Sequence, residues 1–133
     1  MASMINMDEL LRNSEQNRKK DERELKIFSQ YQKVFDESCF EWSRDRQYNI
    51  MFLRQQERYM NDLLQVRGYL FLNEIYRALG VSETITGQVC GWIFKRENSI
   101  GDNYVSFEIW EDPEGNYIVI DFNVDGMILD KVF

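Results

Sequence analysis

At 133 residues, with 44% hydrophobic and 14% aromatic side chains, the chain has the size and composition of one folded domain. It contains no histidine, which excludes the commonest general base and most zinc and iron sites, and its glycines form no phosphate-binding loop, so we expect neither catalytic residues nor a cofactor. Residues 67–133 hold 5 basic and 11 acidic side chains, and so carry -6 of the net charge of -7. This balance argues against direct binding of nucleic acid and favours a protein partner with a basic surface.

Residues 5–30 are rich in helix-forming side chains and contain no glycine or proline. Apolar positions become sparse between Arg12 and Glu24, so this helix cannot bury a continuous stripe and is expected to project into solvent or to lie against a partner. We therefore predict a helical appendage over residues 1–31, able to form a homo-oligomer through residues 5–30, and a single domain over 32–133. The chain has no apolar run long enough to span a membrane, and we expect no membrane contact.

The central part of the chain predicts helices flanked by short strands. Strand-like residues on both sides of the turn-prone segment 36–38 suggest a small hairpin within residues 33–42. Ser43 is a suitable N-cap for a long helix that Gly68 ends, and a shorter helix over 72–79 ends at Gly80. Cys39 and Cys90 lie among apolar neighbours, which is typical of buried free thiols in a reducing compartment.

The last third of the chain predicts a β-hairpin over residues 104–124. Apolar and polar side chains alternate on both sides of the turn at residues 112–115, so one face should be buried and the other solvated. The apolar tail from residue 127 should add an edge strand or close the core. The fold class is therefore α+β, with a long helix and short helices packed on a small antiparallel sheet that ends in a C-terminal β-hairpin.

Acidic and aromatic side chains gather around this hairpin, and they are the candidate binding residues. They are Glu108, Trp110, Glu111, Asp112, Glu114, Tyr117 and Asp121. Tyrosine and tryptophan often anchor interfaces, and carboxylates would attract a basic partner. Two alternatives remain open: the acids are an ordinary solvated surface, or a second helix covers this face and makes the aromatics part of the core.

One spacing resembles the start of a calcium-binding loop. Asp121, Asn123 and Asp125 precede Gly126 as in such loops, but the position that needs a bidentate glutamate is Val132. The preceding residues also predict a strand where the motif requires a helix. We therefore expect no metal here, with these three side chains as the only candidates for one.

Several short runs between residues 58 and 92 resemble a known family. They are Arg58–Asn61, Arg67–Tyr76, Leu79–Gly80 and Gly91–Trp92. They look like the C-terminal domain of an uncharacterised family of phage and prophage proteins of Gram-positive bacteria, without that family's hydrophobic N-terminal segments. The resemblance covers about residues 33–124, and it implies a fold and a viral setting without any activity or site residue. The family commonly has serine or threonine where this chain has Phe71, so we expect Phe71 to pack instead of capping the helix.

This resemblance, together with the charge, implies a phage-encoded accessory protein in the cytoplasm of the host bacterial cell. It would bind another protein through the acidic, aromatic surface, and a host defence nuclease is a suitable target, as for an anti-CRISPR protein. The alternative is a virion or assembly component that oligomerises through residues 5–30. A third reading, a hydrolase or calcium module, would need a site that works without histidine.

Overall fold

The computed structural model describes residues 30–95 and 101–132. The chain divides into two compact units, Met1–Gln32 and Lys33–Phe133. The helix predicted over residues 5–30 lies outside the described residues, and the appendage stays a prediction. The helices and strands of the described residues all belong to the second unit.

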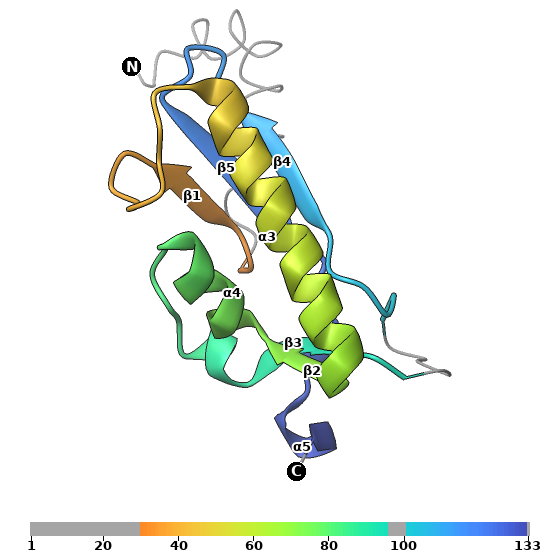
Figure 1. Cartoon of the computed structure of the whole chain (residues 1–133). Coiled ribbons are helices and arrows are strands. Elements are labelled where there is room, and N and C mark those ends of the chain that lie inside the picture. Colours follow the sequence, from red (N-terminus) through yellow and green to blue (C-terminus); the bar gives the residue numbers. More distant parts are fainter. Residues whose placement is uncertain (1–29, 96–100, 133) are drawn as a thin grey trace, which may run out of the picture. The chain divides into compact units, whose positions relative to one another are not determined.

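The second unit is an α+β fold built on two three-stranded antiparallel sheets (Figure 1). Its elements, in chain order, are β1 (Lys33–Asp36), α3 (Arg46–Arg67), β2 (Tyr69–Phe71), α4 (Leu72–Leu79), a short 3-10 helix (Thr86–Gln88), β3 (Cys90–Ile93), β4 (Phe107–Glu111), β5 (Tyr117–Phe122), β6 (Gly126–Met127) and α5 (Leu129–Val132). One sheet has the order β1–β5–β4 and the other the order β2–β3–β6. This confirms the predicted fold class and the C-terminal hairpin.

The N-cap of the long helix α3 lies two residues after Ser43, and the helix begins at Arg46. Asp45 is its N-cap, because the carboxylate accepts hydrogen bonds from the amides of Gln47 and Tyr48 at 3.0 and 3.4 Å. Gly68 ends the helix in the left-handed conformation at φ 86°, where its amide bonds to the carbonyl of Leu64. The predicted helix and its terminating glycine are confirmed, whereas the predicted capping residue was wrong.

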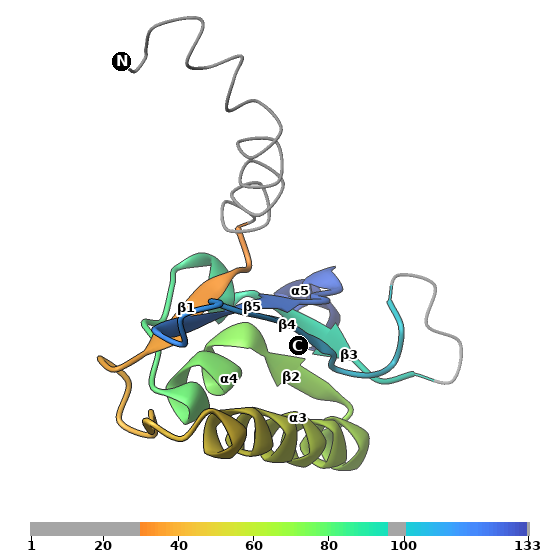
Figure 2. The ribbon, with the colours of Figure 1, turned by 90° about the horizontal axis from the view of Figure 1, so that it is seen from above.

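Helices α3 and α4 lie on the same side of the β1–β5–β4 sheet and form the core with it (Figure 2). The ring of Phe35 on β1 stacks on Phe52 of α3 at 5.7 Å, and Tyr76 of α4 meets the edge of Phe122 on β5 at 5.6 Å. The buried half of the alternation predicted for the hairpin is confirmed, because its apolar face is buried against these helices. The opposite face is not fully solvated, since Val119 on that face is buried as well. Cys39 and Cys90 are buried free thiols, as expected.

The predicted hairpin within residues 33–42 is wrong. Only β1 forms there, and it pairs with β5 instead of with residues 39–42. The carboxylate of Asp36 accepts hydrogen bonds from the amide and the hydroxyl of Ser38, and the amide of Cys39 bonds back to the carbonyl of Asp36. These local bonds turn the chain before a second strand can start.

The segment around Gly91 is the middle strand of the second sheet, which the sequence did not predict. A Cβ atom at Gly91 would overlap the carbonyl oxygen of Leu70 on β2, so the close approach of β2 and β3 requires glycine there. The apolar tail from residue 127 both adds an edge strand and closes the core, which were the two alternatives predicted for it. β6 pairs with β3 at the edge, and Ile128 is fully buried.

Helix α4 starts without a side-chain cap from its N-cap residue. The ring of Phe71 packs edge-on against Tyr69 at 5.8 Å, as expected, and the amide of Phe71 donates to the carboxylate of Glu74 at 2.9 Å. Arg67 holds the same carboxylate with two hydrogen bonds, at 2.6 and 2.9 Å. Burial alone would raise the pKa of Glu74, but these hydrogen bonds and the charge of Arg67 outweigh it, and the pKa is lowered.

We predict that Glu74→Gln destabilises the protein by about 0.5–1 kcal/mol at neutral pH, because glutamine keeps the bond to Phe71 but loses the charge that pairs with Arg67. A carboxyl group with a lowered pKa stabilises the fold above its ordinary pKa of 4.5, and this stabilisation is lost as the pH falls through its pKa in the folded protein. Urea unfolding across pH should therefore show a difference that is constant at neutral pH and shrinks below about pH 4.5. A difference that grows in acid would contradict this assignment.

Candidate interaction surface

Four of the predicted binding residues share the outer face of the β1–β5–β4 sheet, which is turned away from α3 and α4. The strand register pairs Glu108 with Asp121, and it places Trp110 and Tyr117 on the same face. The rings of Trp110 and Tyr117 lie 5.9 Å apart with a tilt of 43°. We call Glu108, Trp110, Tyr117 and Asp121 the outer-face strip.

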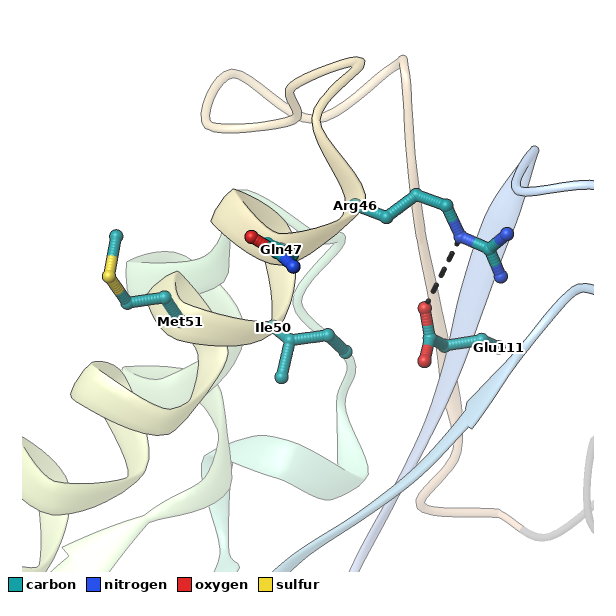
Figure 3. A pocket seen from close by; sticks show the side chains of 5 residues that line it. All are labelled: Arg46, Gln47, Ile50, Met51 and Glu111. Atoms are coloured by element: carbon teal, nitrogen blue, oxygen red, sulfur yellow. Dashed lines mark ion pairs between the residues drawn. The ribbon is translucent and has the colours of Figure 1, made fainter.

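The other three predicted residues lie at the end of the hairpin. Glu111 points toward α3, where its carboxylate is 3.6 Å from the guanidinium of Arg46 (Figure 3). Asp112 is in the turn and accepts a hydrogen bond from the amide of Asn116 at 3.1 Å, and Glu114 is exposed at the tip. The structure therefore places four of the seven predicted residues on the outer face of the sheet and two in or beside the turn. The seventh, Glu111, faces α3.

Asp36 adds a third carboxylate to the outer face, and sequence reasoning missed it. β1 pairs with β5 so that Asp36 lies opposite Tyr117 and Val34 opposite Val119. The alternation of Val34 and Asp36 was visible in the sequence, but no local signal shows that this strand pairs with one about eighty residues later. The described helices α3 and α4 lie on the other side of the sheet, and Trp110 and Tyr117 are half-buried.

Of the three calcium candidates, Asp121 lies in the outer-face strip, whereas Asn123 joins the two sheets and Asp125 bonds to β3. The side-chain oxygen of Asn123 accepts hydrogen bonds from the indole of Trp92 at 3.0 Å and the amide of Ser106 at 2.6 Å, and its amide group donates to the carbonyl of Tyr104 at 3.0 Å. Asp125 accepts from the amide of Ile93 at 3.0 Å. Within residues 30–95 and 101–132, no group of three or more histidine, cysteine or acidic side chains is placed to hold a metal ion.

Side chains of α3 close one part of the free edge of β4. The amide group of Asn61 bonds to both the amide and the carbonyl of Val105, at 2.7 and 2.9 Å. One turn earlier, Glu57 accepts from the amide of Phe107 at 2.7 Å, and Arg54 donates to its carbonyl at 3.0 Å. The helix thus takes the place of a neighbouring strand along this part of the edge.

Further along the edge, a groove separates the first turns of α3 from the end of β4. It has a volume of about 340 Å³ and is lined by Arg46, Gln47, Ile50, Met51 and Glu111 (Figure 3). Ile50 points toward the strand, and the ion pair between Arg46 and Glu111 closes one end of the groove. Sequence reasoning missed this groove, because it depends on how the helix crosses the sheet.

These features define a small α+β protein whose surface offers an acidic, aromatic strand face and a neighbouring groove. The chain belongs to DUF6353, a family of unknown function that it matches over residues 4–132. Comparison with curated proteins and with solved structures finds no match. None of the helices in the described part of the chain is both long and apolar enough to cross a bilayer.

We predict that Asn61→Leu lowers the free energy of unfolding by about 2–4 kcal/mol, because the change leaves the buried amide and carbonyl of Val105 without partners. Chemical denaturation measures this. The matched control is Gln55→Leu, the same kind of change at an exposed position of α3, which should alter stability by about 0.5 kcal/mol or less. Equal effects of the two changes would show that the contact of Asn61 with β4 contributes nothing.

A second prediction separates the calcium interpretation from the structural one. Asn123→Asp completes the acidic spacing of a calcium loop but removes the donor to the carbonyl of Tyr104, so we expect a loss of about 1–3 kcal/mol. Thermal unfolding with and without millimolar calcium measures both effects. Recovery of stability on adding calcium would favour the metal site over the structural role.

Proposed function

We propose that this chain is a phage-encoded accessory protein that acts in the host cytoplasm by binding another protein. The viral setting rests on the resemblance of residues 58–92 to phage and prophage proteins. The binding role rests on one observation, that the register of β4 and β5 gathers the outer-face strip onto one side of the sheet. The lack of histidine supports a role without catalysis.

The chemistry of the outer-face strip suits a basic partner. Tryptophan and tyrosine provide large rigid contact areas with a polar group at one end, which is why they often contribute most of the energy of an interface. Carboxylates around them speed the approach of a positively charged surface and disfavour acidic partners. Asp36 extends the same charge onto β1.

A host defence nuclease is the partner that fits this chemistry best. Such an enzyme must hold nucleic acid in a groove rich in lysine and arginine. An acidic protein surface with aromatic anchors can compete for that groove, and so block the enzyme without any reaction of its own. The proposed activity is therefore like that of an anti-CRISPR protein.

The alternative, a virion or assembly component that oligomerises through residues 5–30, involves residues outside the described part of the chain. It remains a separate prediction. A binding protein for a nuclease should act as a one-to-one partner, whereas an assembly component should form large complexes with itself.

We predict that the full chain co-elutes with a susceptible host defence nuclease at physiological salt and inhibits DNA cleavage. Trp110→Ala combined with Glu108→Gln should weaken inhibition about tenfold or more, because it removes an aromatic anchor and a charge from the outer-face strip. The control is Asp62→Asn, which removes one exposed charge from α3 and should leave inhibition unchanged.

Failure to co-elute with any tested nuclease, together with unchanged cleavage, would remove the nuclease as target. The broader binding proposal would be contradicted by a partner that binds the double variant as tightly as the natural chain.

A further inference from the structure

The hydrogen bonds of β4 show which of its backbone groups point outward. The amide of Asp112 bonds to the carbonyl of Tyr117, and the amide of Asn123 bonds to the carbonyl of Ser106. In an antiparallel pair, residues alternate between those that bond to the neighbouring strand and those that point away from it. With these two ends fixed, Phe107, Ile109 and Glu111 all direct their amides and carbonyls to the free edge.

Only part of this edge is closed. Glu57 and Arg54 take the outward groups of Phe107. The next inward-facing position of α3 is Ile50, which has no polar side-chain atom to offer (Figure 3). Arg46 forms an ion pair with the carboxylate of Glu111 and donates a hydrogen bond to the carbonyl of Asp112. Among the described residues, no side chain bonds to the outward backbone groups of Ile109 or Glu111. An open stretch of strand edge therefore lies directly beside the groove.

An open strand edge is a template for an added strand. The charge around it selects the kind of strand. Residues 105–117 contain four carboxylates and no lysine or arginine, and the nearby Arg46 and Arg54 each pair with a glutamate. A second copy of this chain would bring the same carboxylates together, since antiparallel pairing centred on Trp110 would place Glu108 opposite Asp112 of the other copy.

We propose that β4 binds an extended basic segment of a partner protein as an added strand, hydrogen-bonded to Ile109 and Glu111. Lysine or arginine side chains of the segment would lie beside the outer-face strip, and an aliphatic side chain would enter the groove against Ile50 and Met51. This inference rests on the proposed protein-binding function and specifies the chemistry of the partner. The backbone bonds would supply affinity, and the alternating side chains would supply specificity.

Amide hydrogen exchange on the full chain tests this directly, with a capped peptide of alternating lysine and valine as the probe. We expect the amides of Ile109 and Glu111 to exchange roughly tenfold more slowly, or slower still, with the peptide present. The amide of Phe107 is an internal control, because Glu57 already bonds to it and its exchange should not change. Binding should weaken at high salt, and the same peptide with glutamate in place of lysine should not bind.

Two variants of Glu111 distinguish the contribution of its backbone amide to peptide binding from that of its carboxylate. Glu111→Pro removes the outward amide and Glu111→Ala does not, while both lose the carboxylate. Proline is tolerated at this edge because no bond between β4 and β5 uses that amide. We expect Glu111→Ala to weaken peptide binding roughly two- to threefold and Glu111→Pro about tenfold or more. Circular dichroism checks that each variant is folded. A peptide methylated on alternate amide nitrogens should also lose binding, without any change to the protein.

The outcomes distinguish this inference from the proposed function. Peptide binding without protection of Ile109 and Glu111, or equal binding by the two Glu111 variants, would overturn strand addition and leave binding through the outer-face strip intact. No binding of the basic peptide would overturn strand addition, while co-elution with a nuclease and inhibition of cleavage decide the proposed function separately. Protection that rises with protein concentration alone would show that a second copy occupies the edge, and would overturn the basic segment as its partner.

Discussion

The placement of α3 against the edge of β4 controls the other surface features of this domain. Asn61 bonds to both backbone groups of Val105 much as a neighbouring strand would, and Glu57 and Arg54 repeat the arrangement at Phe107. A buried backbone group without a partner is costly, so these bonds fix the height and angle of the helix over the sheet. The groove and the open edge follow from this placement, because both begin beyond Arg54, the last side chain of the helix that bonds to the strand edge.

The two proposed binding features belong to the same strand. Trp110 presents its ring on the outer face of β4, whereas its neighbours Ile109 and Glu111 present backbone groups at the edge. Backbone bonds are nearly independent of sequence, whereas the ring and carboxylates would discriminate among the proposed partners. A partner that uses both features would lay one extended segment along β4, with part of its bulk over the outer face.

The parts of the fold that depend on nearby residues could be predicted from the sequence. The long helix has a terminating glycine, and the hairpin has alternation and turn residues. The pairing of β1 with β5 could not be predicted, because it joins distant segments and no local pattern records it. The inward side of Glu111, in contrast, follows from its alternation with Phe107 and Ile109 along β4. Asn123 was interpreted through its spacing to aspartates, yet side-chain amides that bind metals and those that join sheets use the same residue types.

The closing of a strand edge by a helix has an evolutionary consequence. How much of β4 remains open is determined by the side chains along one face of α3, and the boundary falls at Ile50. A single change from an aliphatic to an amide side chain at that position would extend the closed part of the edge, and a change of Arg54 to an aliphatic side chain would free the carbonyl of Phe107. Descendants of this protein can therefore gain or lose a docking strand while the strand itself keeps its sequence.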